Sequence, residues 1–311
     1  MSKRFLLVLD DVWKEEEWDK SKWDNVLAPL ASGGFCALIE IFKASRCLRL
    51  LYICTHELEM IPEEIRYLKH LRHLKIERVD VTRLPRSPMK LPKNYISSIC
   101  GIGKLKPLQE LNMFDLRDVS SYRIGELENM NDLCKLGINC LENVKDAEEA
   151  CSAKLFSKRR LTNLTLCWSN TDSRIIDLDE NVLDNLQPPK CLRNPSIKRY
   201  MGASSAIWMN NVNLLSNVEK IELTECLQCK TLPPFGQLPF LKSLTLSNMP
   251  KVKRLESKFN GNDKYHAFPL LEKLYIFGLE ALEDWFEAGV AGEDGCLFPS
   301  LIKLCYITAR S

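Results

Sequence analysis

Apolar residues recur along most of the chain in the pattern Leu-x-x-Leu-x-Leu, with apolar residues at the first, fourth and sixth positions. Successive side chains of a β-strand point to opposite faces, so the residues between these positions face solvent when the apolar ones face a core. The pattern therefore predicts one short strand in each copy. Beyond residue 45 the copies begin at Leu48, Leu71, Leu108, Leu133, Leu161, Leu192, Val218, Leu241, Leu271 and Leu301.

The distance between successive copies, 23 to 37 residues, indicates the fold class. A unit of this length cannot bury its own apolar residues, whereas stacked units bury a continuous core. Most spacings lie close to the ~20–29 residues of the leucine-rich repeat, in which each unit adds one parallel strand to a curved sheet. We therefore expect an α/β leucine-rich-repeat solenoid, shaped as a horseshoe, with Leu241, Leu244 and Leu246 buried.

Two copies depart from the pattern. The copy at Leu192 has Pro195 at its fourth position, and proline lacks the N–H that a strand ladder uses. The long gap after Leu71 contains Pro85, Pro88 and Pro92, as a repeat with a damaged strand would. We expect local irregularity at both places without a break in the array.

The first 45 residues follow a different pattern. Phe5–Leu9 is a short apolar run that suits a buried parallel strand, and Asp10 and Asp11 follow it directly. In P-loop nucleotidases such a pair holds magnesium and orients a water, beside a glycine-rich loop that cradles the phosphates. The best candidate for that loop, Gly101–Lys104, is followed by leucine instead of a hydroxyl residue, and a turn between repeats explains it better. We therefore expect Asp10 and Asp11 to be vestigial and no cofactor to be bound.

Composition excludes several classes of function. The 311 residues carry a formal net charge of +2, so the charge of the chain gives no indication that it binds nucleic acid or an anionic membrane. No apolar run approaches the length of a membrane span. The 13 cysteines show no framework spacing, and no leader sequence is apparent, which favours free thiols in the cytoplasm. Cys226 and Cys229 lack the two further ligands that a structural zinc site needs. Cys226 occupies the ninth repeat position, where this repeat class has Asn or Cys to satisfy backbone groups inside the bend. No hydrolase motif is present, so we expect a protein that is not an enzyme.

Several segments together resemble one family. FLLVLDDVW at the N-terminus, Ile124–Ala150, Leu232–Leu255 and Phe268–Trp285 are similar to plant nucleotide-binding leucine-rich-repeat disease-resistance proteins of the coiled-coil subclass. The resemblance implies that residues 1–45 are a remnant of the nucleotide-binding (NB-ARC-like) domain and that residues 46–311 are the leucine-rich-repeat domain. The resemblance also leads us to expect a chain that is truncated relative to that family, without most of the nucleotide-binding domain and its phosphate loop.

The resemblance and the repeat pattern together predict a protein-interaction module of plant defence. Its partner would be a protein, either a pathogen effector or a host guard or signalling protein. Two alternatives stay open: an ADP/ATP-dependent switch, as in intact family members, and a degenerate fragment without function. The solvent-facing positions of the five clearest repeats are the candidate partner-binding residues: Arg72, His73, Lys75, Thr162, Asn163, Thr165, Glu219, Lys220, Glu222, Lys242, Ser243, Thr245, Glu272, Lys273 and Tyr275.

Overall fold

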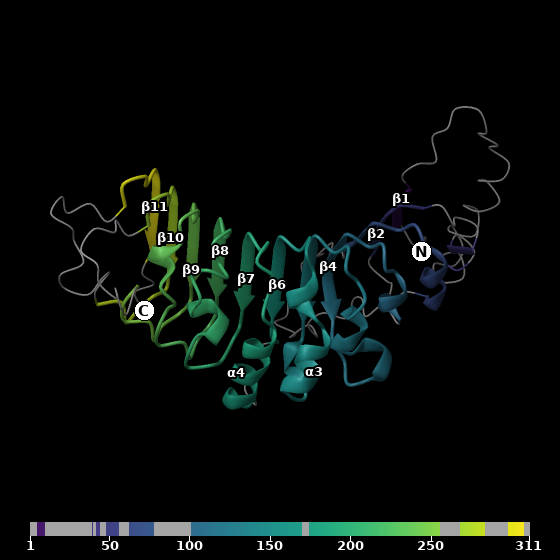
Figure 1. Cartoon of the computed structure of the whole chain (residues 1–311), viewed down its shortest axis with the longest axis horizontal. Coiled ribbons are helices and arrows are strands. Elements are labelled where there is room, and N and C mark those ends of the chain that lie inside the picture. Colours follow the sequence, from purple (N-terminus) through teal and green to yellow (C-terminus); the bar gives the residue numbers. More distant parts are fainter. Residues whose placement is uncertain are drawn as a thin grey trace, which may run out of the picture.

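The chain forms one open, curved sheet whose strands lie side by side in the order of the sequence (Figure 1). The computed structural model describes residues 5–9, 39, 42–43, 48–55, 62–77, 101–169, 174–255, 268–283 and 298–307, without the side chains of 5–9, 52–55, 63 and 75–77. Within these ranges the strands are β1 (Phe5–Leu9), β2 (Leu50–Thr55), β3 (His73–Glu77), β4 (Glu110–Asp115), β5 (Lys135–Asn139), β6 (Asn163–Cys167), β7 (Asn194–Lys198), β8 (Lys220–Thr224), β9 (Ser243–Ser247), β10 (Lys273–Phe277) and β11 (Lys303–Ile307).

Short helical turns connect the strands and close the other side of each unit. Two α-helices, α3 (Ala147–Ser152) and α4 (Ile176–Asn185), lie against each other below the middle strands in Figure 1. The remaining described turns are 3-10 helices: η2 (Glu63–Tyr67), η3 (Ile102–Lys104), η4 (Ser120–Tyr122), η5 (Ile124–Leu127), η6 (Leu141–Asn143), η7 (Leu155–Ser157), η8 (Ile207–Asn210) and η9 (Phe235–Gln237). The sequence that most resembles a phosphate loop forms η3, and Leu105 after it is fully buried in the core.

The ten strands β2 to β11 confirm the repeat pattern. Each begins two residues after the first apolar position predicted for its unit, and each pairs in parallel with the next. In the β9 unit Leu241, Leu244 and Leu246 are at most 1% exposed, as predicted. The chain is therefore a leucine-rich-repeat solenoid with a single continuous apolar core.

Backbone hydrogen bonds repeat from unit to unit at both ends of the strands. The carbonyl oxygen of Lys242, at the second position of its unit, accepts bonds from the N–H groups of Glu272 and Lys273, both at 2.9 Å. The same two-donor arrangement recurs at every step from Arg49 to Glu272. Beyond the strand, the N–H of Asn248 donates to the carbonyl oxygen of Phe277 at 2.8 Å. These bonds fix the register of each unit against the next.

The proline repeat is irregular in the way that the sequence predicts. Pro195 in β7 pairs with Leu164 of β6, but pairing with β8 begins only at Ser196. Proline has no N–H to donate, so the ladder is shortened on one side and the solenoid continues. The proline-rich segment after β3 lies outside the described residues.

Strand β4 contains a bulge that the sequence pattern did not predict. Met113 occupies the sixth position of its unit and should face the core, yet it is 50% exposed, whereas Phe114 is fully buried. The register against β5 shifts between Leu111 and Phe114, because two residues of β4 lie opposite the single residue Gly137. A side chain at Gly137 would bring its Cβ to 2.1 Å from the carbonyl oxygen of Asn112, so the bulge depends on this glycine.

The strand Phe5–Leu9 forms as predicted but pairs in the opposite direction. β1 is antiparallel to β2, with Phe5 opposite Thr55 and Leu9 opposite Leu51, and therefore extends the repeat sheet at its N-terminal end. The sequence suggested a parallel strand because such strands are central in nucleotide-binding sheets; here the available partner is the edge of the solenoid. Asp10 and Asp11 lie outside the described residues. In the described part of the chain, no helix is long and apolar enough to cross a membrane.

The bulge gives a stability prediction. Gly137→Ala places a methyl group against the Asn112 carbonyl, and we expect the free energy of unfolding to fall by about 1–3 kcal/mol. Gly125→Ala is the matched control, since its nearest atom is the Ser152 hydroxyl oxygen at 3.2 Å, which a side-chain rotation can move. Urea denaturation followed by circular dichroism measures both. Equal stability of the two variants would show that β4 does not need a glycine opposite its bulge.

Candidate interaction surface

The third, fifth and seventh residues of each unit form the solvent-facing side of the sheet, which we call the open face. Because adjacent strands are in register, the same position of successive units forms a row across the sheet. In the third-position row Lys220, Ser243 and Lys273 are neighbours. In the fifth-position row Glu222, Thr245 and Tyr275 are neighbours. The open face is thus a grid of side chains on a fixed backbone.

The structure places the predicted partner-binding residues on or beside the open face. Arg72, Lys220, Lys242 and Lys273 are exposed, and the others whose side chains are described are partly exposed. The side chain of Lys75 lies outside the described part. Accessibility is common to the described members of the set, so internal contacts decide which of them are available to a partner.

Some of these side chains are already engaged within the sheet. The hydroxyl of Thr162 donates to the carbonyl oxygen of Cys134 at 3.2 Å and lies 2.9 Å from the amide oxygen of Asn163. That carbonyl also accepts the backbone N–H groups of Thr162 and Asn163. Thr162 therefore supports the strand connection, whereas Thr165 three positions further on has a partly exposed side chain without this constraint.

A carboxylate on the N-terminal half of the open face lies between two basic side chains. In the third-position row Glu110 of β4 lies between His73 of β3 and Lys135 of β5. Its carboxylate is 2.9 Å from the Lys135 ammonium and 3.8 Å from the His73 ring nitrogen Nδ1. Opposite charges in facing positions stabilise a sheet by roughly 0.2–1 kcal/mol, so this row is electrostatically self-complementary.

Ion pairs continue across β7 and β8. Distances between the charged groups are 2.8 Å for Arg193 and Glu219, 2.6 Å for Lys220 and Glu222, and 2.6 Å for Arg199 and Glu225. All six side chains are at least one-third exposed, so each pair contributes at most about 1 kcal/mol. The predicted residues Glu219, Lys220 and Glu222 therefore have partners within the chain.

The last three repeats differ from this arrangement. Lys273 and Lys303 occupy facing third positions of β10 and β11, and Tyr275 and Phe277 follow on the same face. The Lys303 ammonium lies 5.3 Å from the centroid of the Tyr275 ring, and the rings of Tyr275 and Phe277 lie 6.4 Å apart, nearly parallel. Lys303 and Phe277 belong to this group, although the sequence reasoning did not include them; the same row rule applied to the later repeats would have found both.

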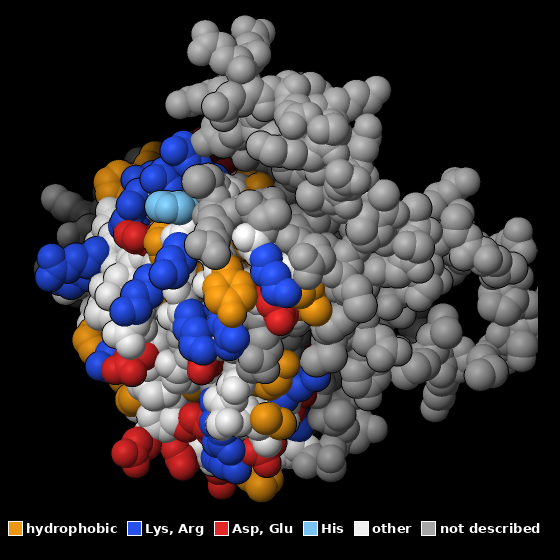
Figure 2. Space-filling view, turned by 90° about the vertical axis from the view of Figure 1, so that its right-hand side faces the viewer, with side chains coloured by type: hydrophobic (Ala, Val, Ile, Leu, Met, Phe, Trp, Pro, Cys, Tyr) orange, Lys and Arg blue, Asp and Glu red, His pale blue; other side chains and the backbone are white. Residues whose placement is uncertain are grey.

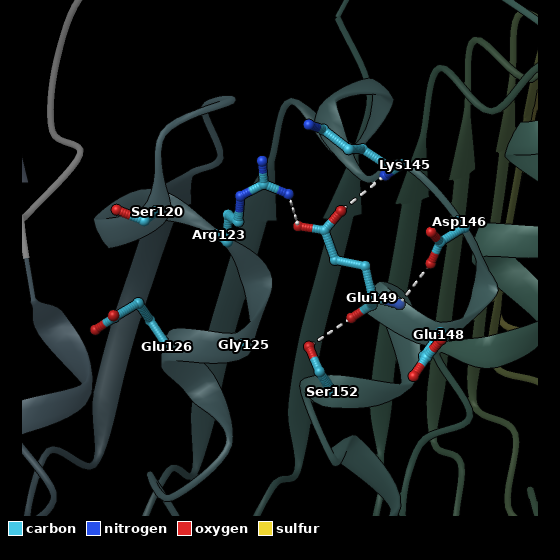
Figure 3. Close-up of a pocket in the computed structure, with 9 residues that line it drawn as sticks. All are labelled: Ser120, Arg123, Gly125, Glu126, Lys145, Asp146, Glu148, Glu149 and Ser152. Carbon is cyan, nitrogen blue, oxygen red and sulfur yellow. Dashed lines mark hydrogen bonds and ion pairs between the residues drawn. The ribbon is translucent and has the colours of Figure 1, made fainter.

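A polar hollow of about 490 Å³ lies away from the open face, between the η4–η5 segment and α3 (Figure 3). Several of its charged groups are hydrogen-bonded within or beside the hollow. Arg123 donates to Glu149 at 3.1 Å and to Asp118 at 2.7 Å, the backbone N–H of Lys145 donates to Glu149 at 2.9 Å, and Asp146 caps the start of α3. These bonds hold two repeats together, so we assign the hollow a structural role.

The thiol of Cys226 lies at the strand-to-turn bend, as its ninth position predicts. Its sulfur is 3.7 Å from the carbonyl oxygen of Thr224 and 3.9 Å from that of Ile197. Burial raises the pKa of Cys226 to about 12 and that of Cys229 to about 11. Both thiols therefore remain protonated at neutral pH and act as small core residues with weak donors.

Seen from its N-terminal end, the described surface mixes Lys and Arg side chains with carboxylates and apolar groups (Figure 2). This distribution agrees with the small net charge of the whole sequence. The visible surface therefore lacks the uninterrupted positive field that binding of a nucleic-acid backbone requires.

Comparisons with known proteins agree with this geometry. Residues 124–249 match the family described as R13L1/DRL21 LRRs. The chain is 32% identical over 197 residues to the disease resistance RPP13-like protein 1 of Arabidopsis thaliana, and 32% identical over 187 residues to the disease resistance protein RGA2 of Solanum bulbocastanum. Its repeats are similar to those of plant disease-resistance proteins. Each match covers 58% of this chain, and the chain spans less than a fifth of the length of these relatives.

One lysine of this repeat array, Lys158, is unusual because its side chain lies in the core. Lys158 is fully buried, and its ammonium donates to the carbonyl oxygens of Leu127 at 2.6 Å and Met130 at 3.4 Å. Burial lowers the pKa of Lys158 from 10.5 to about 8. These bonds hold carbonyl groups of the preceding unit, so a packing role accounts for the residue.

We expect Lys158 to make stability depend on pH. Its pKa is lower in the folded than in the unfolded chain, so between about pH 8 and pH 10.5 the unfolded chain binds more protons and the free energy of unfolding rises with pH. The rise is at most about 3 kcal/mol. Lys158→Met removes this group, so the stability of the wild type relative to the variant should increase across that window in urea denaturation. A constant difference would mean that the amine titrates normally.

Proposed function

We propose that the repeat array is a protein-interaction module of plant defence and that its open face binds the partner. The observation that carries the proposal is the set of accessible side chains in rows across the described part of the parallel sheet, in register from β8 to β11, in repeats similar to those of plant disease-resistance proteins. Rigid solenoids use such extended faces for recognition, because each unit contributes a few fixed side chains to one large surface.

The proposed partner is a protein in the cytoplasm, either a pathogen effector or a host guard or signalling protein, and the proposed activity is binding without catalysis. The resemblance to disease-resistance proteins and the mixed charge of the chain support this choice. We also propose the division into a nucleotide-domain remnant, residues 1–45, and a repeat domain, residues 46–311. Pairing of β1 with β2 means that the remnant adds a strand to the repeat sheet.

A pair of positions on the open face tests the proposal. A photo-crosslinking amino acid at Thr165 or Thr245, both partly exposed fifth-position residues, should capture a partner in plant tissue. The control is the same amino acid at exposed Glu148 on α3, away from the open face. Mass spectrometry identifies the captured protein, which is then purified for affinity measurements.

With that purified partner, we expect Thr245→Arg to weaken binding at least tenfold, because a long charged side chain disrupts a fitted interface. Glu148→Arg should leave the affinity unchanged. The open face would not be the binding surface if the crosslinker at position 148 captured the partner equally well, or if Thr245→Arg left the affinity unchanged.

The alternative nucleotide switch leads to a separate prediction. Most of the affinity for ADP in a P-loop protein comes from loop amides and the loop lysine, whereas the carboxylates act chiefly through the metal. Asp10 and Asp11 supply the carboxylates, and Gly101–Lys104 belongs to a repeat turn. Calorimetric titration of this chain with Mg-ADP should show no saturable binding. A one-to-one isotherm that is lost in the Asp10→Ala/Asp11→Ala double variant would favour the switch.

A further inference from the structure

The third-position row of the open face breaks its charge pattern at the C-terminal end. At β4 and β5 the facing residues are Glu110 and Lys135, which form an ion pair. At β10 and β11 the facing residues are Lys273 and Lys303, on strands roughly 4.8 Å apart. Like charges in facing positions destabilise a sheet, so this pair costs stability where the earlier pair contributes it.

Within the described part of the chain, no carboxylate forms an ion pair with this pair of lysines. The third-position neighbour on β9 is Ser243, and the fifth-position residues beside the pair are Tyr275 and Cys305. A third lysine, Lys242, is exposed at the second position of the β9 unit, between Glu219 of the β8 unit, which pairs with Arg193, and Glu272 of the β10 unit. At the second and third positions of the last three repeats there are thus three lysines and one carboxylate.

Aromatic and aliphatic side chains accompany the lysines. Tyr275 and Phe277 lie on the same face of β10, and the Lys303 ammonium contacts the Tyr275 ring. The last unit has four exposed large apolar side chains, Ile302, Leu304, Tyr306 and Ile307, of which Ile307, 55% exposed, is at the seventh position and therefore on the open face. A ligand for this surface needs negative charge to relieve the lysine pair and apolar side chains to cover the rings and the aliphatic groups.

We propose that the open face of β9–β11 binds an extended acidic segment of a partner protein, with one of its carboxylates bridging Lys273 and Lys303 and its apolar side chains on Tyr275 and Phe277. The proposal rests on the proposed function and adds the chemistry of the partner. A protein segment supplies both carboxylates and aliphatic side chains at alternate positions, whereas a nucleic acid requires a longer cationic track than three lysines.

Stability measurements test the electrostatic premise without a ligand. Lys273→Glu converts the facing pair to opposite charges and should raise the thermal unfolding midpoint by about 1–3 °C at low salt. The matched change Lys135→Glu puts two carboxylates opposite each other and should lower the midpoint by a similar amount. Salt at ~1 M should shrink both shifts by screening. A lower midpoint for Lys273→Glu would overturn the premise that the lysine pair is repulsive.

Binding measurements test the ligand. The probe is a fluorescent eight-residue peptide of alternating Glu and Leu, measured by fluorescence anisotropy against the full chain. We expect at least tenfold weaker binding for Lys273→Glu, for a peptide in which Gln replaces Glu, and at ~0.5 M salt. Lys106→Glu, an exposed lysine in a turn before β4, should change the affinity less than twofold.

Three outcomes would overturn the proposal: equal affinity for the Glu and Gln peptides, equal affinity of the wild type and Lys273→Glu, and tighter binding of a single-stranded RNA octamer than of the acidic peptide. Failure of the broader proposal is recognised separately by the crosslinking at Thr165 and Thr245. A crosslinked partner whose affinity is indifferent to Lys273→Glu leaves the open face as an interaction surface and removes only the acidic-segment inference.

Discussion

Each repeat needs its two neighbours to bury its leucines, and this need determines the rest of the structure. A five-residue strand with apolar residues on one side has no core of its own, so Leu244 and Leu246 of β9 become buried only between the neighbouring β8 and β10 units. Stacking fixes the strand direction and the register, and the carbonyl oxygen at the second position of each unit holds two N–H groups of the next. The same register forces the remaining side chains outward in rows, so the core creates the open face.

The opposite side of each unit has no such regularity, because its length and composition vary. Where it is long, buried polar contacts replace leucine packing. In the unit between β6 and β7, Arg174 and Asp179 form an almost fully buried ion pair at 3.1 Å, and Arg174 also donates to the carbonyl oxygen of Arg199 at 2.6 Å. Burial raises the pKa of Asp179 despite this partner. Such a pair adds specificity of packing more than stability, since desolvation offsets much of the attraction.

The sequence predicts the strands well because their signal is periodic and each copy repeats the same physical requirement. All ten strand positions from Leu50 to Lys303 follow from that rule. The repeat rule does not predict the bulge in β4, because Met113 and Phe114 are both apolar and either could enter the core. Which of them does so depends on Gly137 of the next strand, which has no side chain. The sequence does not predict the direction of β1 for a related reason. A short apolar run is compatible with parallel or antiparallel pairing, and the strand available as a partner determines which of the two forms.

The candidate surface is likewise predicted by the sequence only in part. Repeat positions place every candidate residue on or beside the open face, but they do not tell which charges are satisfied, since this depends on the facing residue of another unit. Glu219 and Lys220 have internal partners, whereas Lys273 faces another lysine. A stable array has no need of that arrangement, because a carboxylate at either position would bind its neighbour, as Glu110 binds Lys135. Local electrostatics that work against the fold are typical of places where a sequence serves a partner instead, and in this chain they occur beside the stacked rings of Tyr275 and Phe277 on the open face.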